Sequence, residues 1–188
     1  MPNQTHVCPW WLTYSFDNPL RLLLQKPEPV LRDVVHEGDH CLDLGCGFGY
    51  FTIPMARLAG EAGTVTAVDL QRQMLARVRK RAVRAGLLPR IQLHQSDSSG
   101  IRFEAAFDFA LAFWMLHEVP DQALMLSQIR TALKPGGRLL LVEPRIHVSR
   151  EAFDRTVATA EPVGLTRVAD PHVSLSRAVL LEAPCRTS

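Results

Sequence analysis

Apolar and polar positions alternate along most of the chain in two recurring patterns. Short apolar runs rich in β-branched residues, such as 64–70, predict buried strands, and longer stretches with apolar residues at helical spacing, such as 71–87, predict helices. Strands that alternate with helices in this way predict an α/β fold built on a doubly wound sheet. We expect strands at 40–44, 64–70, 90–94, 107–114, 138–143, 165–168 and 178–182, and helices at 27–35, 50–59, 71–87, 121–133 and 149–160.

The segments between the expected strands indicate how these strands pair. The last two, 165–168 and 178–182, have no helical segment between them, so they should be antiparallel. The run 107–114 is apolar almost throughout, which is typical of a strand buried on both faces of a parallel sheet. The sequence therefore predicts a mostly parallel, seven-stranded sheet with an antiparallel last strand.

A glycine-rich motif, Asp43-x-Gly45-x-Gly47-x-Gly49, follows the first expected strand. Glycine lets a ligand approach the backbone closely, and the first N–H groups of the next helix have no partner within that helix. The motif differs from the G-x-G-x-x-G of dinucleotide-binding loops, because its third glycine comes one residue early. A carboxylate beside the loop would repel a pyrophosphate and suits a ligand that carries an amino group. The alternative is an ordinary glycine turn between a strand and a helix.

An acidic residue also closes the second expected strand. Asp69 lies 20 residues after Gly49 (69 − 49), which is the distance at which an acid can accept hydrogen bonds from both hydroxyls of a ribose. The alternative is that Asp69 caps the helix that follows. Asp97, just after the third expected strand, could likewise serve a ligand or simply cap a turn.

The glycine motif, these acids, the strand 107–114 and the turn Leu133-Lys134-Pro135-Gly136-Gly137 together resemble the class I S-adenosylmethionine-dependent methyltransferases, over about Leu31 to Ala183. The chain looks most like the small ubiquinone/menaquinone-type members. The resemblance implies the strand order 3-2-1-4-5-7-6, S-adenosylmethionine as the cofactor, and methyl transfer by in-line displacement at the sulfonium. It also implies that Asp97 hydrogen-bonds the adenine amino group, and that the cofactor is bound by Asp43, Gly45, Cys46, Gly47, Gly49, Asp69, Leu70, Asp97, Phe113 and Trp114.

Two ionisable residues, His117 and Glu118, lie just beyond the fourth expected strand and are the candidate catalytic residues. Ligands bind at the carboxyl ends of strands in such sheets, so His117 could act as a general base or orient the acceptor. The alternative is a histidine that is hydrogen-bonded or packed at a turn. Glu143 and His147 follow the fifth expected strand on the same rim and come next.

The tip of the fourth expected strand favours a small-molecule methyl acceptor. It reads Phe113-Trp114-Met115-Leu116, whereas the amino-methylating DNA and protein enzymes carry Asn/Asp-Pro-Pro-Tyr/Phe there. No cysteine lies at this tip, as a cytosine C5 enzyme would require. The alternatives are an RNA or protein methyltransferase, a non-catalytic protein that binds the cofactor, and a nicotinamide enzyme, which the loop spacing disfavours.

Composition narrows the class of protein further. A chain of 188 residues with net charge +2 predicts one domain, 27–188, without a strongly charged partner. The four cysteines include no C-x-x-C pair, so we expect neither a disulfide framework nor a metal site, and a cytoplasmic location. No apolar run approaches the ~20 residues of a membrane helix. A basic stripe in the helix 71–87 could contact nucleic acid, but we expect a solvated face, formed by Arg77, Lys80, Arg81 and Arg84.

The first 26 residues are rich in aromatic residues and proline, and they follow neither a helical nor a strand period. We interpret 1–26 as an N-terminal arm. It could cover an apolar edge of the sheet, form a lid over the cofactor cleft, or do both.

Overall fold

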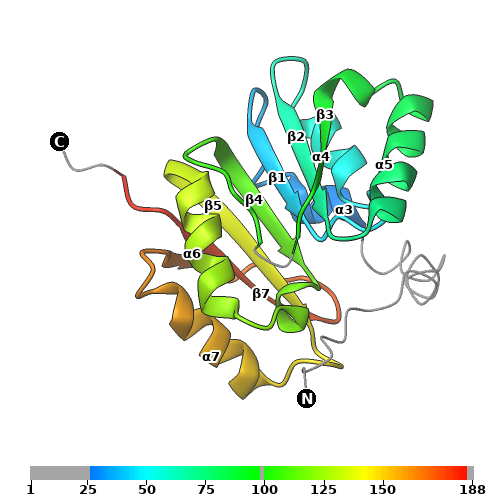
Figure 1. Ribbon diagram of the computed structural model, residues 1–188. Coiled ribbons are helices and arrows are strands. Elements are labelled where there is room, and N and C mark those ends of the chain that lie inside the picture. The colour runs from blue at the N-terminus through cyan, green and yellow to red at the C-terminus, as the bar shows by residue number, and fades with distance from the viewer. Residues whose placement is uncertain (1–25, 98–99, 186–188) are drawn as a thin grey trace.

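The computed structural model describes residues 26–97 and 100–185, which form a seven-stranded sheet with helices on both faces (Figure 1). The strand order is β3-β2-β1-β4-β5-β7-β6, which confirms the predicted order and fold class. The strands are β1 (His40–Leu44), β2 (Thr64–Asp69), β3 (Ile91–Gln95), β4 (Phe107–Phe113), β5 (Leu133–Pro144), β6 (Thr166–Ala169) and β7 (Ser176–Glu182).

The directions of the strands follow the connections between them. β1 pairs in parallel with β2 and β4, and β2–β3 and β4–β5 are parallel as well. β7 is antiparallel to both β5 and β6, because the chain returns from β6 to β7 without a helix. The predicted antiparallel closure is therefore confirmed.

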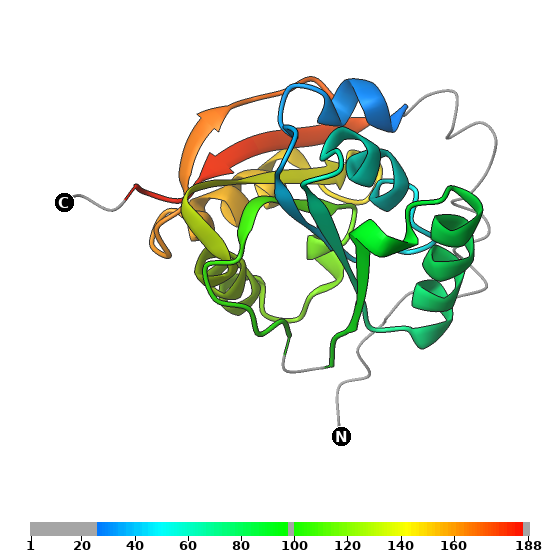
Figure 2. The same ribbon diagram turned by 90° about the horizontal axis from the view of Figure 1, so that it is seen from above.

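Helices cover the two faces of the sheet in separate groups (Figure 2). The first group packs over β2, β1 and β4 around buried residues such as Met55, Val78 and Phe109, and the second packs over β4, β5 and β7 around residues such as Leu126, Ile129 and Leu139. The first group is α3 (Pro27–Leu31), α4 (Thr52–Leu58) and α5 (Arg72–Arg84), and the second is α6 (Gln122–Ala132) and α7 (Arg150–Ala160).

Several predicted boundaries were wrong by a few residues. The expected helix 27–35 ends at Leu31, and the helix 71–87 ends at Arg84, two residues before Gly86, whose φ is +69°. β5 starts at Leu133 rather than at 138, because the expected turn 133–137 is already part of the strand. Its Gly136 N–H donates to the Ala183 carbonyl, just beyond β7. Of the predicted arm 1–26, residues 1–25 lie outside the described residues.

One ion pair fixes the amino-terminal edge of the sheet, opposite the ends where the expected site lies. The Lys134 Nζ lies 2.7 Å from Asp108 Oδ2 and 2.9 Å from Asp108 Oδ1, and the His40 N–H donates to the same carboxylate at 2.9 Å. Burial alone would raise the pKa of Asp108, but the hydrogen bonds from Lys134 and His40 outweigh it and lower that pKa. These contacts join β1, β4 and β5.

We expect Lys134→Met to lower the free energy of unfolding by about 1 kcal/mol at neutral pH, since Asp108 loses a charged donor in a partly exposed site. The folded-state pKa of Asp108 lies below its unfolded value of about 4, so the contribution is present above that value and is lost as the pH falls through the folded-state pKa. Urea unfolding of both proteins at several pH values measures the effect.

Arg90→Gln is the matched control for this change. It breaks a pair with Glu61 whose side chain is 92% exposed, so its effect should be smaller at every pH. Equal losses in the two variants, or a Lys134→Met effect that grows in acid, would contradict the assigned role.

Candidate functional site

The carboxyl ends of the parallel strands β1, β2, β4 and β5 meet at one edge of the sheet. The glycine loop follows β1, Asp69 ends β2, Trp114 follows β4, and Glu143 lies near the end of β5. The residues predicted to bind the cofactor and to act in catalysis lie at or just beyond the ends of strands of this sheet. The structure therefore brings most of the predicted site together at one edge.

The three glycines of the loop all have positive φ values, +63° at Gly45, +51° at Gly47 and +77° at Gly49. A Cβ on Gly45 would lie 2.9 Å from the Met115 Cβ, and one on Gly49 would lie 3.2 Å from a methyl group of Val78. Nothing lies within 4 Å of the position of a Cβ on Gly47. Packing thus requires the outer two glycines, whereas the middle one presents open backbone to a ligand.

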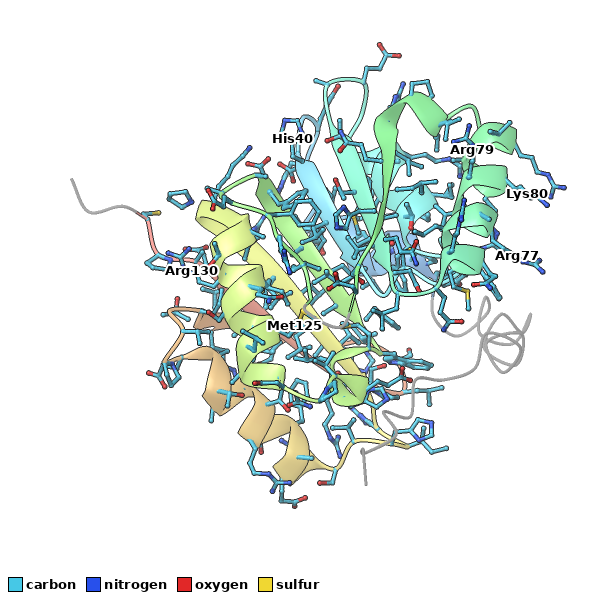
Figure 3. All side chains as sticks on the ribbon, viewed as in Figure 1. His40, Arg77, Arg79, Lys80, Met125 and Arg130 are labelled. Atoms are coloured by element: carbon cyan, nitrogen blue, oxygen red, sulfur yellow. The ribbon has the colours of Figure 1, made fainter. Side chains whose placement is uncertain are left out.

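Two arginines of α5 contact this loop. The Arg81 Nη1 donates to the Phe48 carbonyl at 3.0 Å, and the guanidinium of Arg77 lies 5.3 Å from the centre of the Phe48 ring. The prediction of a solvated basic face was therefore wrong for Arg81, which is partly buried, whereas Arg77, Arg79 and Lys80 are exposed and project outward from the helix (Figure 3). The sequence did not reveal this role, because the contacts join residues 29 or more positions apart.

Asp69 contacts the glycine loop directly. Its Oδ2 accepts from the Gly47 N–H at 3.0 Å, and its Oδ1 accepts from the Gln71 N–H at 2.8 Å. Burial raises the pKa of Asp69, although the backbone donors at Gln71 and Gly47 oppose that shift. Each carboxylate oxygen has a second lone pair for a ligand hydroxyl. The contact with the Gln71 N–H is also what we expect if Asp69 caps the helix that follows β2. The hydrogen bonds from Asp69 to a ribose therefore stay a prediction.

Asp43 lies beneath the loop and does not act as a free carboxylate. It is 3% exposed on the central strand β1, and its Oδ2 accepts from the Thr52 hydroxyl at 2.5 Å. Burial raises the pKa of Asp43 to about 7. The hydrogen bond from Thr52 lowers this pKa, and the negative charge of Asp69 raises it further. The notion of an accessible carboxylate was wrong, since a central strand between two helical layers leaves this side chain buried.

The other residues predicted to bind the cofactor fall into two groups. Leu70 is 44% exposed beside Asp69, and Asp97 is exposed just after β3, so both can meet a ligand at the rim. Cys46 and Phe113 are buried, and the Phe113 ring packs 4.2 Å from that of Phe51. The side chains of this second group belong to the core, so only their backbone could contact a cofactor.

Trp114 redirects the chain at the end of β4. Its φ of +59° is unusual for a residue with a side chain, and such strained positions cluster at functional sites. The indole N–H donates to the Ser176 hydroxyl of β7 at 3.0 Å, so the side chain is held by β7. The chain then enters the short turn η2 (Leu116–Glu118), which carries His117 toward β5.

His117 forms a close pair with Glu143, a residue that is 2% exposed. The His117 backbone N–H donates to Oε1 at 3.0 Å, and the ring Nδ1 lies 2.5 Å from Oε2. The hydrogen bond with Glu143 raises the pKa of His117, burial opposes it, and the charges of Glu143 and Glu118 add to the rise. Glu118 is exposed and does not line the cavity described below. Its catalytic role stays a prediction.

A cavity of about 350 Å³ lies beside this pair, between η2, β5, α6 and α7. The His147 ring lies parallel to that of His117 within 12°, with 6.1 Å between the ring centres. The α7 side chains that line the cavity could not be identified from the sequence, because they recur at ordinary helical spacing. The cavity is lined by His117, Gln122, Glu143, His147, Val148, Ala152, Arg155, Thr156 and Thr159.

Residues 26–97 and 100–185 contain neither a metal-binding cluster nor a membrane-spanning helix. No group of three or more His, Cys, Asp or Glu side chains in this part of the chain could hold a metal ion. None of its helices combines the length and the apolar character that a membrane crossing requires.

Comparison with known proteins gives a consistent result. A family model described as a methyltransferase domain matches residues 41–137, from β1 through the glycine turn of β5. The ubiquinone/menaquinone biosynthesis C-methyltransferase UbiE of Teredinibacter turnerae is 35% identical over 124 residues, which cover 64% of this chain and 50% of that protein. The demethylmenaquinone methyltransferase of Bacillus velezensis is 31% identical over 63% of this chain and 52% of its own length. The chain thus spans about half the length of these relatives.

Solved structures share the fold. A SAM-dependent methyltransferase from Aquifex aeolicus superposes with a TM-score of 0.84 at 23% identity, covering 94% of this chain and 99% of that one. The [4+2]-cyclase SpnF superposes with a TM-score of 0.73 at 18% identity, over 84% of this chain and 80% of that one. At these identities the likeness establishes the fold alone.

We expect Gly45→Ala to lower the free energy of unfolding by about 2–3 kcal/mol, because the new methyl group meets the Met115 Cβ and the backbone stays at positive φ. The matched control is Gly86→Ala, at φ +69° with open space around it, which should cost only about 1 kcal/mol. Thermal or urea unfolding measures both. If the two losses were equal, the close packing of the loop on Met115 would be refuted.

Proposed function

The chain belongs to the methyltransferase domain family, and from this premise we propose that it transfers a methyl group from S-adenosylmethionine to a small-molecule acceptor. The observation that carries the proposal is the contact between Asp69 and the Gly47 N–H, which closes a glycine loop of this family's type over the end of β2. The family and the fold indicate S-adenosylmethionine as the cofactor. The acceptor proposal is supported by one relative that is named for ubiquinone/menaquinone biosynthesis and another that is named a demethylmenaquinone methyltransferase.

The residues present fit this cofactor. The open backbone at Gly47 gives room for close approach of its amino-acid end, and the free lone pairs of Asp69 can accept from the ribose hydroxyls. The exposed Leu70 offers an apolar surface to the adenine, and Asp97 can accept from the adenine amino group. Asp43 would act from below, by holding Thr52 at the start of α4.

When bound, S-adenosylmethionine supplies an electrophilic methyl group on a sulfonium. The residues of this chain then align the acceptor and manage its proton. Glu143 occupies Nδ1 of His117, so Nε2 is the ring nitrogen left to accept a proton from an acidic acceptor. The buried carboxylate stabilises the imidazolium that forms. A base placed in this way contributes about 10²–10⁴-fold to the rate.

Two narrower expectations belong to the same proposal. We expect the acceptor to be a small molecule rather than a nucleic acid, because the cavity beside His117 is small and two arginines of the basic helix are engaged by the loop. The cytoplasmic location stays a prediction.

Asp69→Ala should weaken the binding of S-adenosylmethionine by about 1–3 kcal/mol, because the ribose hydroxyls lose their acceptor. Calorimetric titration measures this, with Asp154→Ala, an exposed acid on α7, as the control that keeps full affinity. Unchanged affinity in Asp69→Ala would overturn the ribose assignment. Failure of the unaltered protein to bind either the cofactor or its demethylated product at millimolar concentration would remove the proposed function.

His117→Ala should slow methyl transfer by about 10²–10⁴-fold with little change in cofactor affinity. The base works when unprotonated and its pKa is raised, so the rate should increase with pH through a value above about 6.5. Glu143→Gln removes the main cause of the raised pKa, so the acidic limb should move to lower pH. Rate–pH profiles of the three proteins test this. A Glu143→Gln profile with an unmoved limb, or a large loss of cofactor affinity in His117→Ala, would contradict it.

A further inference from the structure

Arg177, on β7, has a buried nitrogen without a hydrogen-bond partner. Within residues 26–97 and 100–185, its Nε is the one buried side-chain nitrogen or oxygen that makes no hydrogen bond. The side chain as a whole is partly buried. A donor that is buried in this way has lost its hydrogen bonds with water and has gained none in return. Such a group calls for an explanation in the function of the protein.

The register of the sheet places Arg177 directly beside Glu143. β7 pairs with β5 in antiparallel register, and Arg177 lies opposite Glu143. Side chains that are directly opposite lie on the same face, with their Cβ atoms about 4.5–5.5 Å apart. This face is the one that α6 and α7 cover, because Leu141 and Val179, the next inward pair of the same register, pack in the core beneath those helices. Arg177 is thus the cross-strand neighbour of the residue that binds His117.

The charge of Arg177 lies near the start of α7. Hydrogen bonds with its own backbone and with Ser149 lower the pKa of the exposed Glu151, in the first turn of that helix. The positive charge of Arg177 lowers this pKa further. The Arg177 side chain therefore runs from β7 toward the first turn of α7, with its Nε buried along the way.

The carboxylate of Glu143 needs a positive charge nearby. Glu143 is 2% exposed, and its two oxygens contact the backbone N–H and the ring Nδ1 of His117. In the proposed function, the His117 ring is neutral until it takes a proton from the acceptor. A carboxylate that is buried beside a neutral ring is costly unless a cation lies close to it. Arg177 supplies a permanent cation, because a guanidinium does not lose its proton.

The other charged groups around the pair are less suited to this role. Glu118, on η2, is acidic and adds to the rise in the pKa of His117. His147, after β5, is exposed and carries a charge only when it is protonated. Arg155, on α7, lines the cavity but is exposed, so water screens its charge. Arg177 combines a permanent charge with partial burial and a place opposite Glu143.

We propose that Arg177 is a positioning residue of the His117–Glu143 pair, and that its charge keeps the Glu143 carboxylate ionised beside a neutral His117 ring. The inference rests on the proposed function, in which this ring is the base. A cation beside the pair disfavours a second positive charge on the ring, so the imidazolium releases its proton more readily. Arg177 thereby limits the effect of Glu143 without touching the acceptor.

NMR titration of the full chain, labelled with ¹⁵N in histidine, measures the protonation of His117 without cofactor or acceptor, and His117→Gln assigns its signal. We expect Arg177→Met to raise the proton affinity of His117 at least about threefold, which moves its midpoint to higher pH. Arg177→Gln, a second neutral variant, should do the same. Arg177→Lys restores the charge and should return the midpoint toward that of the unaltered protein. Glu143→Gln should move the midpoint in the opposite direction, to lower pH.

Arg150→Met is the matched control, since Arg150 is exposed at the start of α7 and lies on no strand beside Glu143. It should leave the midpoint of His117 unchanged. A midpoint that stays in place or falls in both neutral variants of Arg177, or that moves equally in Arg150→Met, overturns the inference.

The proposed function is tested separately, by calorimetric titration of S-adenosylhomocysteine. If the unaltered protein binds this compound while the His117 midpoint does not respond to Arg177, the inference falls and the proposed function stands. If the compound does not bind, the proposed function falls together with the catalytic meaning of the inference, whatever the titration shows.

Discussion

The hydrogen bond from the Gly47 N–H to the Asp69 carboxylate is the contact on which the rest of the site depends. It joins the loop after β1 to the tip of β2, and it requires a loop backbone that only glycine adopts without strain. Burial makes ionisation of Asp69 less favourable, so the carboxylate relies on the backbone donors around it. A ligand hydroxyl would enter a position in which these donors are already arranged.

The packing of the two helical layers supports this contact from below and from the side. Val78 and Met115 leave no room for side chains at the outer glycines, and α5 holds Phe48 at the turn of the loop. Asp43 and Thr52 join β1 to the start of α4 within the core. The loop is therefore positioned by rigid elements, as a site for a precisely oriented transfer reaction requires.

The sequence predicted the features that rest on local patterns. The strands, the antiparallel closure, the glycine loop and the placement of Asp69 beside it follow from hydrophobic periodicity and motif spacing. It failed where distant segments meet. The clamp of Arg77 and Arg81 on Phe48, the pair of His117 with Glu143, and the wall from α7 all join residues far apart in the chain. Burial of Asp43 was missed for a related reason, because a motif shows which residues lie near a ligand but not which way their side chains face.

The proposed function divides the site into two halves. The first layer, around the loop and Asp69, suits binding of the nucleoside, and the second, around His117, Glu143 and the cavity, suits the acceptor. Trp114 lies at the junction, where its backbone turns the chain from β4 toward His117.

A crystal structure of the chain with S-adenosylhomocysteine tests this account most directly. The account predicts the nucleoside across the ends of β1 and β2, both ribose hydroxyls within hydrogen-bond distance of Asp69, and the sulfur facing the cavity beside His117. A nucleoside bound at another place, or a loop that closes over Gly47 and excludes it, would contradict the account.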